Sequence, residues 1–231
     1  DDASTDDTPA KVDAWTARDS RIRAIHLPAT RKLPGALNEG FRHARGQFFT
    51  WTSDDNAYAP EALARMLEVL AARPEVDVVY ADTTWVDAAG SPLRVEPARP
   101  PEDLAIGNCV GPCFLCRREV HETLGGYDES LFLAEDYDFW LRASHEFRLE
   151  PLPGPIYFYR QHRESLGAQH AAAVSLAAQL AVERWLRQAK GWPRRTRGRA
   201  MEMLGLRALV RGDANAGRSR SPRPRRGFRR I

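Results

Sequence analysis

The chain has 231 residues, which is enough for one α/β domain with a sizeable core and a modest extension. Its composition, 43% hydrophobic and 28% charged, excludes collagen-like, coiled-coil and wholly disordered proteins, and no apolar run approaches the roughly 18 to 20 residues that a membrane span needs. The net charge of +3 conceals a basic end, because residues 193–231 carry +11 and leave −8 on residues 1–192.

The first part of the chain alternates helix signals with short strand signals. Pro9 marks a helix start at Asp7 or Thr8, and Gly46 is a typical residue just after a helix end. The expected elements are a helix from about residue 8 to 18, a strand at 22–25, a helix from Pro34 to about Gly46 and a strand at 47–52.

A third helix–strand pair follows. After Pro60, a periodic helix places Leu63, Met66, Leu67 and Leu70 on one stripe, and residues 76–86 form a β-branched and aromatic strand. Three such alternations predict a largely parallel sheet with helices on its faces. In such sheets the ligand crevice lies at the carboxyl ends of the strands.

Beyond residue 90 the signals are less regular. The expected elements are a strand at 109–117, a turn at 125–128, a helix from Glu135, a proline-punctuated extended segment at 151–160 and two helices at 171–189 and 196–210. The two last helices are expected to pack on the domain as a hairpin. Residues 211–231 lack the apolar groups that would offset the ordering entropy, so we expect them to be disordered.

Three cysteines, Cys109, Cys113 and Cys116, lie within eight residues of one another. An odd set at this spacing does not make a disulfide framework, and its C-x3-C-x2-C pattern lacks a fourth soft ligand for zinc. We therefore expect buried thiols and, since no signal-peptide pattern opens the given sequence, a reducing, cytoplasmic setting.

Two pairs of neighbouring carboxylates are candidates for chemistry. Asp54 and Asp55 follow the strand at 47–52, where they would either hold a divalent cation or simply turn the chain before the Pro60 helix. Glu135 and Asp136 open a helix, where they would either act on a substrate or compensate the helix dipole.

Either pair alone favours the structural role. Together they match a metal-assisted transfer from a phosphorylated donor, with one pair for the metal and the other for proton transfer. His162, after the extended segment, is either a third metal ligand or a surface histidine.

Four motifs, in this order, resemble those of the family 2 glycosyltransferases, which have a nucleotide-sugar-binding GT-A fold. Residues 1–8 (DDASTDDT) resemble the family's acidic loop DDGSTDGT, and residues 33–46 resemble its "ALN-G…A-G" helix. Residues 50–56 (TWTSDDN) resemble its metal-binding acidic segment, and residues 124–142 resemble its "GGFDE…EDYDLWLR" stretch. The resemblance covers residues 1 to about 165.

The resemblance implies roles on the donor side of a site. Asp1 or Asp2 would contact the nucleobase, and Arg31 or Lys32 would lie near the nucleotide. Asp54 and Asp55 would engage the metal and the diphosphate, and His162 stays a candidate third ligand of the metal from its position alone.

On the acceptor side, Asp136 would be the catalytic base, and Glu135 would help to shape the acceptor site. The implied reaction is inverting: Asp136 takes a proton from an acceptor hydroxyl as that oxygen attacks the anomeric carbon, while Mg²⁺ or Mn²⁺ stabilises the departing nucleoside diphosphate. The implied donor is a UDP-, GDP- or dTDP-sugar, and the acceptor is a saccharide or a lipid-linked molecule. The implied process is envelope or extracellular polysaccharide synthesis at the inner face of the membrane.

The chain departs from the family pattern in three places. The first strand, first helix and second strand, about 35 residues on typical lengths, are absent from the given sequence. Thr52 stands where many members carry the first Asp of a DxD triplet, and the basic end matches nothing in the family. We therefore expect a truncated GT-A domain at 1–165, a helical extension at 166–210 and an Arg-rich disordered tail at 211–231.

Two alternatives remain open. The chain is either a catalytically inactive relative that binds a sugar nucleotide or a partner, or a protein that binds a polyanion or a membrane surface through its basic end. Because Trp192 and Phe228 are the only aromatic residues near that end, stacking on bases is poorly supported and no specific nucleic acid is expected. A weak attraction to an anionic leaflet would be compatible with the enzyme.

Overall fold

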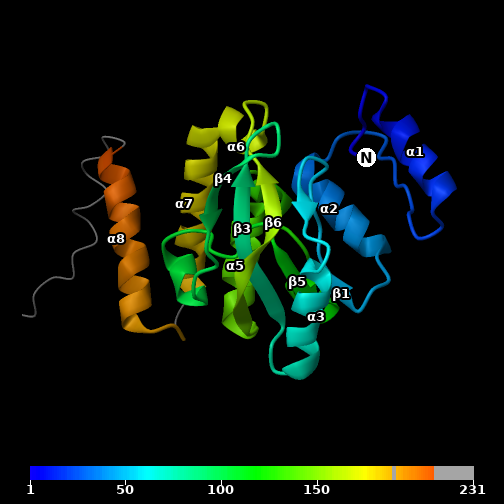
Figure 1. Cartoon of the computed structure of the whole chain (residues 1–231). Helices are drawn as coiled ribbons and strands as arrows, with labels where there is room; N and C mark the ends of the chain where they lie inside the picture. Colours follow the sequence, from blue (N-terminus) through cyan, green and yellow to red (C-terminus); the bar gives the residue numbers. More distant parts are fainter. Residues whose placement is uncertain (189–190, 211–231) are drawn as a thin grey trace, which may run out of the picture.

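The computed structural model describes residues 1–188 and 191–210 (Figure 1). The tail at 211–231, expected to be disordered, lies outside the described residues. No helix of the described part is both long and apolar enough to cross a membrane.

A six-stranded sheet forms the centre of the molecule, with strand order β1-β5-β3-β6-β2 and β4 paired to β3. Its strands are β1 (Phe48–Phe49), β2 (Ala57–Tyr58), β3 (Val78–Val86), β4 (Pro92–Glu96), β5 (Phe114–Arg117) and β6 (Leu149–Arg160). Among the described strands only the β3–β6 pair is parallel, so the prediction of a largely parallel sheet is wrong for them. A tight turn joins β3 to β4, which forces an antiparallel pair, whereas β6 follows a long connection that contains a helix.

The helices of the first half agree with the sequence patterns more closely than the strands do. They are α1 (Thr8–Arg18), α2 (Lys32–His43) and α3 (Ala62–Ala72). The helix expected from Pro34 begins two residues earlier, at Lys32, and ends at His43 before reaching Gly46. Residues 22–25, expected as a strand, do not form one: their backbone bonds within the described residues are isolated, from Ile22 N–H to Asp19 O at 3.0 Å and from the Asp1 amino group to Ile25 O at 2.9 Å.

The stripe predicted on α3 is narrower than expected. Met66 and Leu70 are buried against the sheet together with Ala62, at a spacing of four residues. Leu63 and Leu67, also assigned to the stripe, are 47% and 41% exposed. The sheet therefore covers one row of the helix and leaves the adjacent row in solvent.

Two cores lie on opposite faces of the sheet, and β3 supplies both. Val78 and Tyr80 belong to a core with Trp140, whereas Val79 packs with Met66 of α3 in the other. This alternation follows from the two-residue period of a strand, and it makes β3 a strand buried on both faces.

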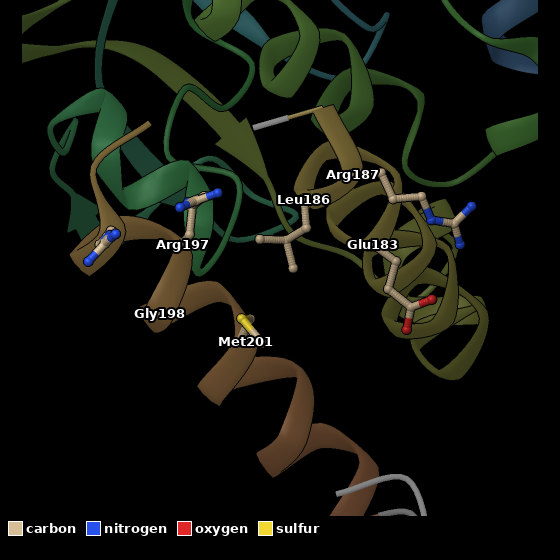
Figure 2. Close-up of a pocket in the computed structure, with 7 residues that line it drawn as sticks. Glu183, Leu186, Arg187, Arg197, Gly198 and Met201 are labelled. Carbon is tan, nitrogen blue, oxygen red and sulfur yellow. The ribbon is translucent and has the colours of Figure 1, made fainter. Parts of the chain in front are cut away.

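The remaining helices follow β5 along the chain. They are α4 (Arg118–Leu124), α5 (Glu135–Glu146), α6 (Leu166–Gln169), α7 (Ala171–Gln188) and α8 (Arg194–Val210), with 3₁₀ turns η1 (Pro101–Ala105) and η2 (Glu129–Leu131). α7 packs on α5, and α8 packs on α7 and η1, so the predicted hairpin forms. A hollow opens between α7 and α8 (Figure 2).

The three cysteines are buried free thiols, as the sequence predicts. Burial raises the pKa of each thiol to about 12, which keeps them protonated and unreactive at neutral pH.

Candidate active site

The acidic segment after β1 holds one carboxylate in an unusual state. Asp55 is partly buried, and its Oδ2 lies 2.9 Å from Nε2 of His162, two residues beyond the end of β6. Its other oxygen, Oδ1, is buried without a hydrogen-bond partner among the described residues. Because an unpaired buried carboxylate oxygen is costly, this atom marks a place where a further group would be stabilising.

Arg160 fixes this segment in place. Its Nε donates to the carbonyl of Asp55 at 3.0 Å, and its backbone N–H donates to Oδ1 of Asn56 at 2.8 Å. The same guanidinium donates to the carbonyls of Asp87 and Ala88 in the turn between β3 and β4. One side chain at the end of β6 therefore ties the acidic segment to the neighbouring turn.

The residues of this segment fit a divalent cation in part. A carboxylate oxygen without a partner beside an imidazole is a donor set that such an ion accepts. Asp54 is exposed, and in the described part of the chain no group of three or more His, Cys, Asp or Glu side chains could hold a metal. Of the predicted metal ligands Asp54, Asp55 and His162, only Asp55 and His162 are in contact. Further ligands would have to come from a substrate or from water.

The second carboxylate pair opens α5. Oδ2 of Asp136 accepts a hydrogen bond of 2.8 Å from Nδ2 of Asn108, and its Oδ1 accepts one of 2.7 Å from the N–H of Tyr137. Burial raises the pKa of the Asp136 carboxyl, while these two hydrogen bonds counteract that rise. Asn108 is itself oriented by the N–H of Gly111, which donates to its Oδ1 at 3.3 Å.

Glu135 differs from its neighbour. Its side chain is buried, and its Oε2 has no hydrogen-bond partner in the described part of the chain. Burial, with a further contribution from the charge of Asp136, raises the pKa of Glu135 to about 7. One carboxyl of the pair is therefore poised between its neutral and charged forms near neutrality, while the other has donors that favour its charged form.

The two carboxylate pairs lie near one another at one end of the sheet. Burial raises the pKa of the Tyr159 phenol, and the charges of Asp55 and Asp136 raise it further, so both lie within electrostatic reach of that ring. Tyr159 is the penultimate residue of β6, and its ring packs at 4.6 Å on Trp85, near the end of β3. The contacts of Asp55 with Arg160 and His162 place it at the carboxyl end of β6, where a crevice is expected.

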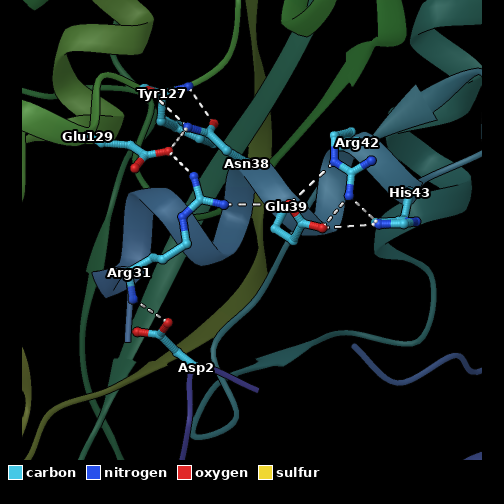
Figure 3. Close-up of polar contacts among 8 residues, drawn as sticks. All are labelled: Asp2, Arg31, Asn38, Glu39, Arg42, His43, Tyr127 and Glu129. Carbon is cyan, nitrogen blue, oxygen red and sulfur yellow. Dashed lines mark hydrogen bonds and ion pairs between the residues drawn. The ribbon is translucent and has the colours of Figure 1, made fainter. Parts of the chain in front are cut away.

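A polar network joins three segments that are far apart in sequence (Figure 3). The Asp2 carboxylate accepts from the backbone N–H of Arg31 at 2.7 Å, and the Arg31 guanidinium lies 2.6 Å from Glu129. Asn38 holds the backbone of Tyr127 with both ends of its amide, at 2.9 and 2.8 Å. Residues 1–2, helix α2 and the turn before η2 are therefore held as one unit.

The other predicted donor-side residues flank this network. Oδ2 of Asp1 lies 3.0 Å from Nδ1 of His26, and Nζ of Lys32 lies over the ring of Phe132 at 4.9 Å. Of the two aspartates, Asp2 bonds to Arg31, which precedes helix α2, and Lys32 is the first residue of that helix. Within the described residues, no contact places this group on the Asp55–His162 pair.

Three non-glycine residues near the predicted site have left-handed backbone conformations. They are Ala3 (φ 61°), Lys32 (φ 59°) and Leu133 (φ 78°). Each lies within two residues of a predicted site residue or is one itself. Such conformations are uncommon for residues with a Cβ and persist where the surroundings impose them, which they do most often at functional sites.

Sequence reasoning missed four residues that shape this region: Asn38, Asn108, Glu129 and Arg160. Asn38 and Glu129 lie within the family-like motifs, so the sequence marks these two positions but does not indicate what their side chains contact. Asn108 lies in a stretch interpreted as a loop, and no local pattern links it to a residue 28 positions away.

Comparison with known proteins gives a consistent set of relatives. Residues 1–125, more than half of the chain, match the family model described as glycosyl transferase family 2. The O-antigen biosynthesis protein RfbC of Myxococcus xanthus is 30% identical over 186 residues, which cover 79% of the chain but 14% of RfbC. The chain thus spans a small part of that relative's length.

Two solved structures share the fold. The TarS 1-349 fragment of S. aureus in complex with UDP-GlcNAc has a TM-score of 0.69 at 18% identity, covering 96% of the chain and 66% of the fragment. A mannosyltransferase, PcManGT from Pyrobaculum calidifontis, in complex with GDP-Man and Mn²⁺, has a TM-score of 0.52 at 20% identity, covering 94% and 72%.

Proposed function

Because the chain belongs to glycosyl transferase family 2 and has the GT-A fold, we propose that it transfers a sugar from a nucleoside-diphosphate sugar to an acceptor hydroxyl, with inversion at the anomeric carbon. The observation that carries the proposal is the contact of Asp55 with Arg160 and His162 at the carboxyl end of β6, where the charge of Asp136 also raises the pKa of Tyr159. It brings a candidate metal ligand and a candidate base to one end of the sheet.

On the donor side, Asp55 and His162 are the residues that would hold a divalent cation, Mg²⁺ or Mn²⁺. When bound, such an ion neutralises charge on the departing diphosphate. The unpartnered Oδ1 of Asp55 supports this assignment. Asp54, exposed beside it, is proposed to face the diphosphate, and Asp1, Asp2, Arg31 and Lys32 are proposed to contact the nucleotide.

The nature of the donor is supported by two structural neighbours. The TarS fragment was solved in complex with UDP-GlcNAc, and PcManGT in complex with GDP-Man and Mn²⁺. A nucleoside-diphosphate sugar is the chemistry that these two ligands share, and we propose that class of donor for this chain.

On the acceptor side, Asp136 takes the proton of the acceptor hydroxyl as its oxygen attacks the anomeric carbon. The bond from that carbon to the diphosphate breaks in the same step, so no covalent enzyme intermediate forms. Asn108 and the N–H of Tyr137 orient the carboxylate and favour its charged form. Glu135, buried directly beside the base, shapes the acceptor pocket.

We further propose a role in envelope polysaccharide synthesis, with a saccharide or lipid-linked acceptor, at the cytoplasmic face of a membrane. The name of the O-antigen biosynthesis relative supports the process. The basic end of the chain supports an anionic surface as its location.

Calorimetric titration of UDP, GDP and dTDP into the chain, with Mn²⁺ and then with EDTA, tests the donor site. We expect one nucleotide to bind with Mn²⁺, and EDTA or Asp55→Asn to weaken that binding roughly tenfold or more. Glu119→Gln, an exposed acidic residue on α4, is the matched control. A folded chain that binds none of the three nucleotides under either condition would refute the donor-site assignment.

A further inference from the structure

The hollow between α7 and α8 lies outside the site described above. It has a volume of about 550 Å³, and Leu186 of α7 and Met201 of α8 face the space between the two helices (Figure 2). We call it the α7–α8 groove; its lining residues are Glu183, Leu186, Arg187, Arg194, Arg197, Gly198 and Met201.

The charges of the groove are unbalanced. Three arginines, Arg187, Arg194 and Arg197, face one acid, Glu183, whose Oε1 already accepts from Gln179 at 2.8 Å. Among the described residues, none of the three guanidinium groups has an ion-pair partner. The groove therefore keeps an excess of positive charge.

Other arginines on the same two helices behave differently. Arg184 of α7 pairs with Asp128 at 2.6 Å, and Arg199 of α8 pairs with Asp103 at 2.9 Å. These pairs fasten the helices to the body of the domain. The arginines that line the groove form no such pairs within the described residues. They repel one another, and the positive end of the α8 dipole lies beside two of them, so the groove is electrostatically unfavourable when no anion is bound.

An exposed apolar stripe continues the groove. Leu176 and Leu180 lie on the same face of α7 as Glu183 and Arg187, at spacings of four, three and four, and are 51% and 45% exposed. Across the groove, Met201 is 47% exposed. A free phosphate would leave this stripe in water, whereas an amphiphile would cover it.

We propose that the α7–α8 groove docks on an anionic lipid surface. The arginines bind headgroup phosphates, for which their forked donors are suited, and the leucines and Met201 enter the boundary with the acyl chains. Charge complementarity continues along the sequence, because residues 211–231 carry eight further arginines against one acid. This site goes beyond the proposed transfer reaction and does not depend on it.

Sedimentation of the full chain with vesicles tests the proposal. We expect binding to vesicles that contain phosphatidylglycerol but not to vesicles of phosphatidylcholine alone. The triple variant Arg187→Gln, Arg194→Gln, Arg197→Gln should bind roughly 100-fold more weakly, since each arginine near the surface contributes about fivefold. The comparison variant removes the same charge from the tail, with Arg223→Gln, Arg225→Gln and Arg226→Gln, and should bind more tightly than the groove variant because it keeps the groove arginines. An equal loss in both variants would overturn the groove as the docking site.

A second pair of variants separates a lipid surface from a soluble anion. Leu180→Ser with Met201→Ser keeps the charge and should weaken vesicle binding, whereas Leu63→Ser with Leu67→Ser, equally exposed on α3, should not. If the first pair bound vesicles like the parent while inorganic phosphate bound to the groove, the lipid assignment would be wrong. Nucleotide titration without vesicles tests the donor site separately, and every groove variant should retain it.

Discussion

For single residues, the candidate site depends on the different surroundings of two adjacent carboxyls, those of Glu135 and Asp136. Asp136 has two hydrogen-bond donors, whereas Oε2 of Glu135 has none within the described residues. Burial raises the pKa of both carboxyls, and the charge of Asp136 raises that of Glu135 further, whereas the bonds from Tyr137 and Asn108 favour the charged form of Asp136.

Asn108→Ala removes the side-chain donor to Asp136. The pKa of Asp136 should then rise further, so the acid limb of the kcat profile should move to higher pH and kcat at neutral pH should fall roughly tenfold. Steady-state kinetics across pH measures both effects. A uniform loss at every pH would mean that Asn108 supports the loop and not the charge of Asp136.

Glu135→Gln tests the buried carboxyl through stability. The folded-state pKa of Glu135, about 7, lies above its ordinary value of 4.5, so the folded state binds more protons between these values. The parent should therefore lose stability as pH rises from about 4.5 to about 7. The variant should lack this loss and be more stable at pH 8, by about 3 kcal/mol.

Urea unfolding at several pH values measures this difference, and Glu119→Gln, an exposed residue, is the control. If Glu135→Gln followed the parent across that pH range, Glu135 would not carry the shifted pKa.

At the scale of secondary-structure elements, helices could be predicted more fully than strand pairing. α1 and α3 have apolar periodicity and a proline near their first turn, which are local signals. Pairing direction has no local signal, because a run such as residues 78–86 looks the same between parallel and antiparallel neighbours. The segment at 22–25 has strand residues, but among the described residues its backbone makes only isolated bonds to Asp1 and Asp19 and pairs with no strand.

β6 is a second case in which the sequence does not predict strand pairing. Its prolines at 151, 153 and 155 argue against a central strand, yet it pairs along β3. The register shifts around Asp82, whose carboxylate accepts from the N–H of Gly154 at 2.9 Å in place of a ladder bond. The sequence thus predicts that residues 151–160 are extended. Their pairing with β3 depends on the side chain of Asp82, which a local sequence pattern does not indicate.

Arg160→Met tests whether the end of β6 positions the acidic segment. It keeps most of the aliphatic stem but removes the bond to the Asp55 carbonyl, so the Mn²⁺-dependent affinity for nucleotide should fall roughly tenfold. Calorimetry measures the affinity, and Arg163→Met, an exposed neighbour, is the control. Equal affinities in the two variants would remove Arg160 from the positioning of Asp55.

At the scale of the whole molecule, the fold assembles one site from segments that are far apart in the chain. Asp55 follows β1, His162 follows β6, and Asp136 opens a helix between β5 and β6. The motif order predicts these acids as a group, and the charges of Asp55 and Asp136 both raise the pKa of Tyr159. Asn108 and the unpartnered oxygen of Asp55 required the three-dimensional structure, because neither depends on sequence neighbours.

The role of Asp136 as the base is tested by comparing Asp136→Asn with the parent, using two readouts on the same full chain. Calorimetry follows binding of the nucleotide, and release of nucleoside diphosphate from the corresponding sugar donor follows turnover. Glu146→Gln, exposed at the other end of α5, is the control. We predict that Asp136→Asn binds the nucleotide like the parent but turns over roughly 100-fold or more slowly. Turnover equal to that of the parent would contradict Asp136 as the base and, with it, the proposed mechanism.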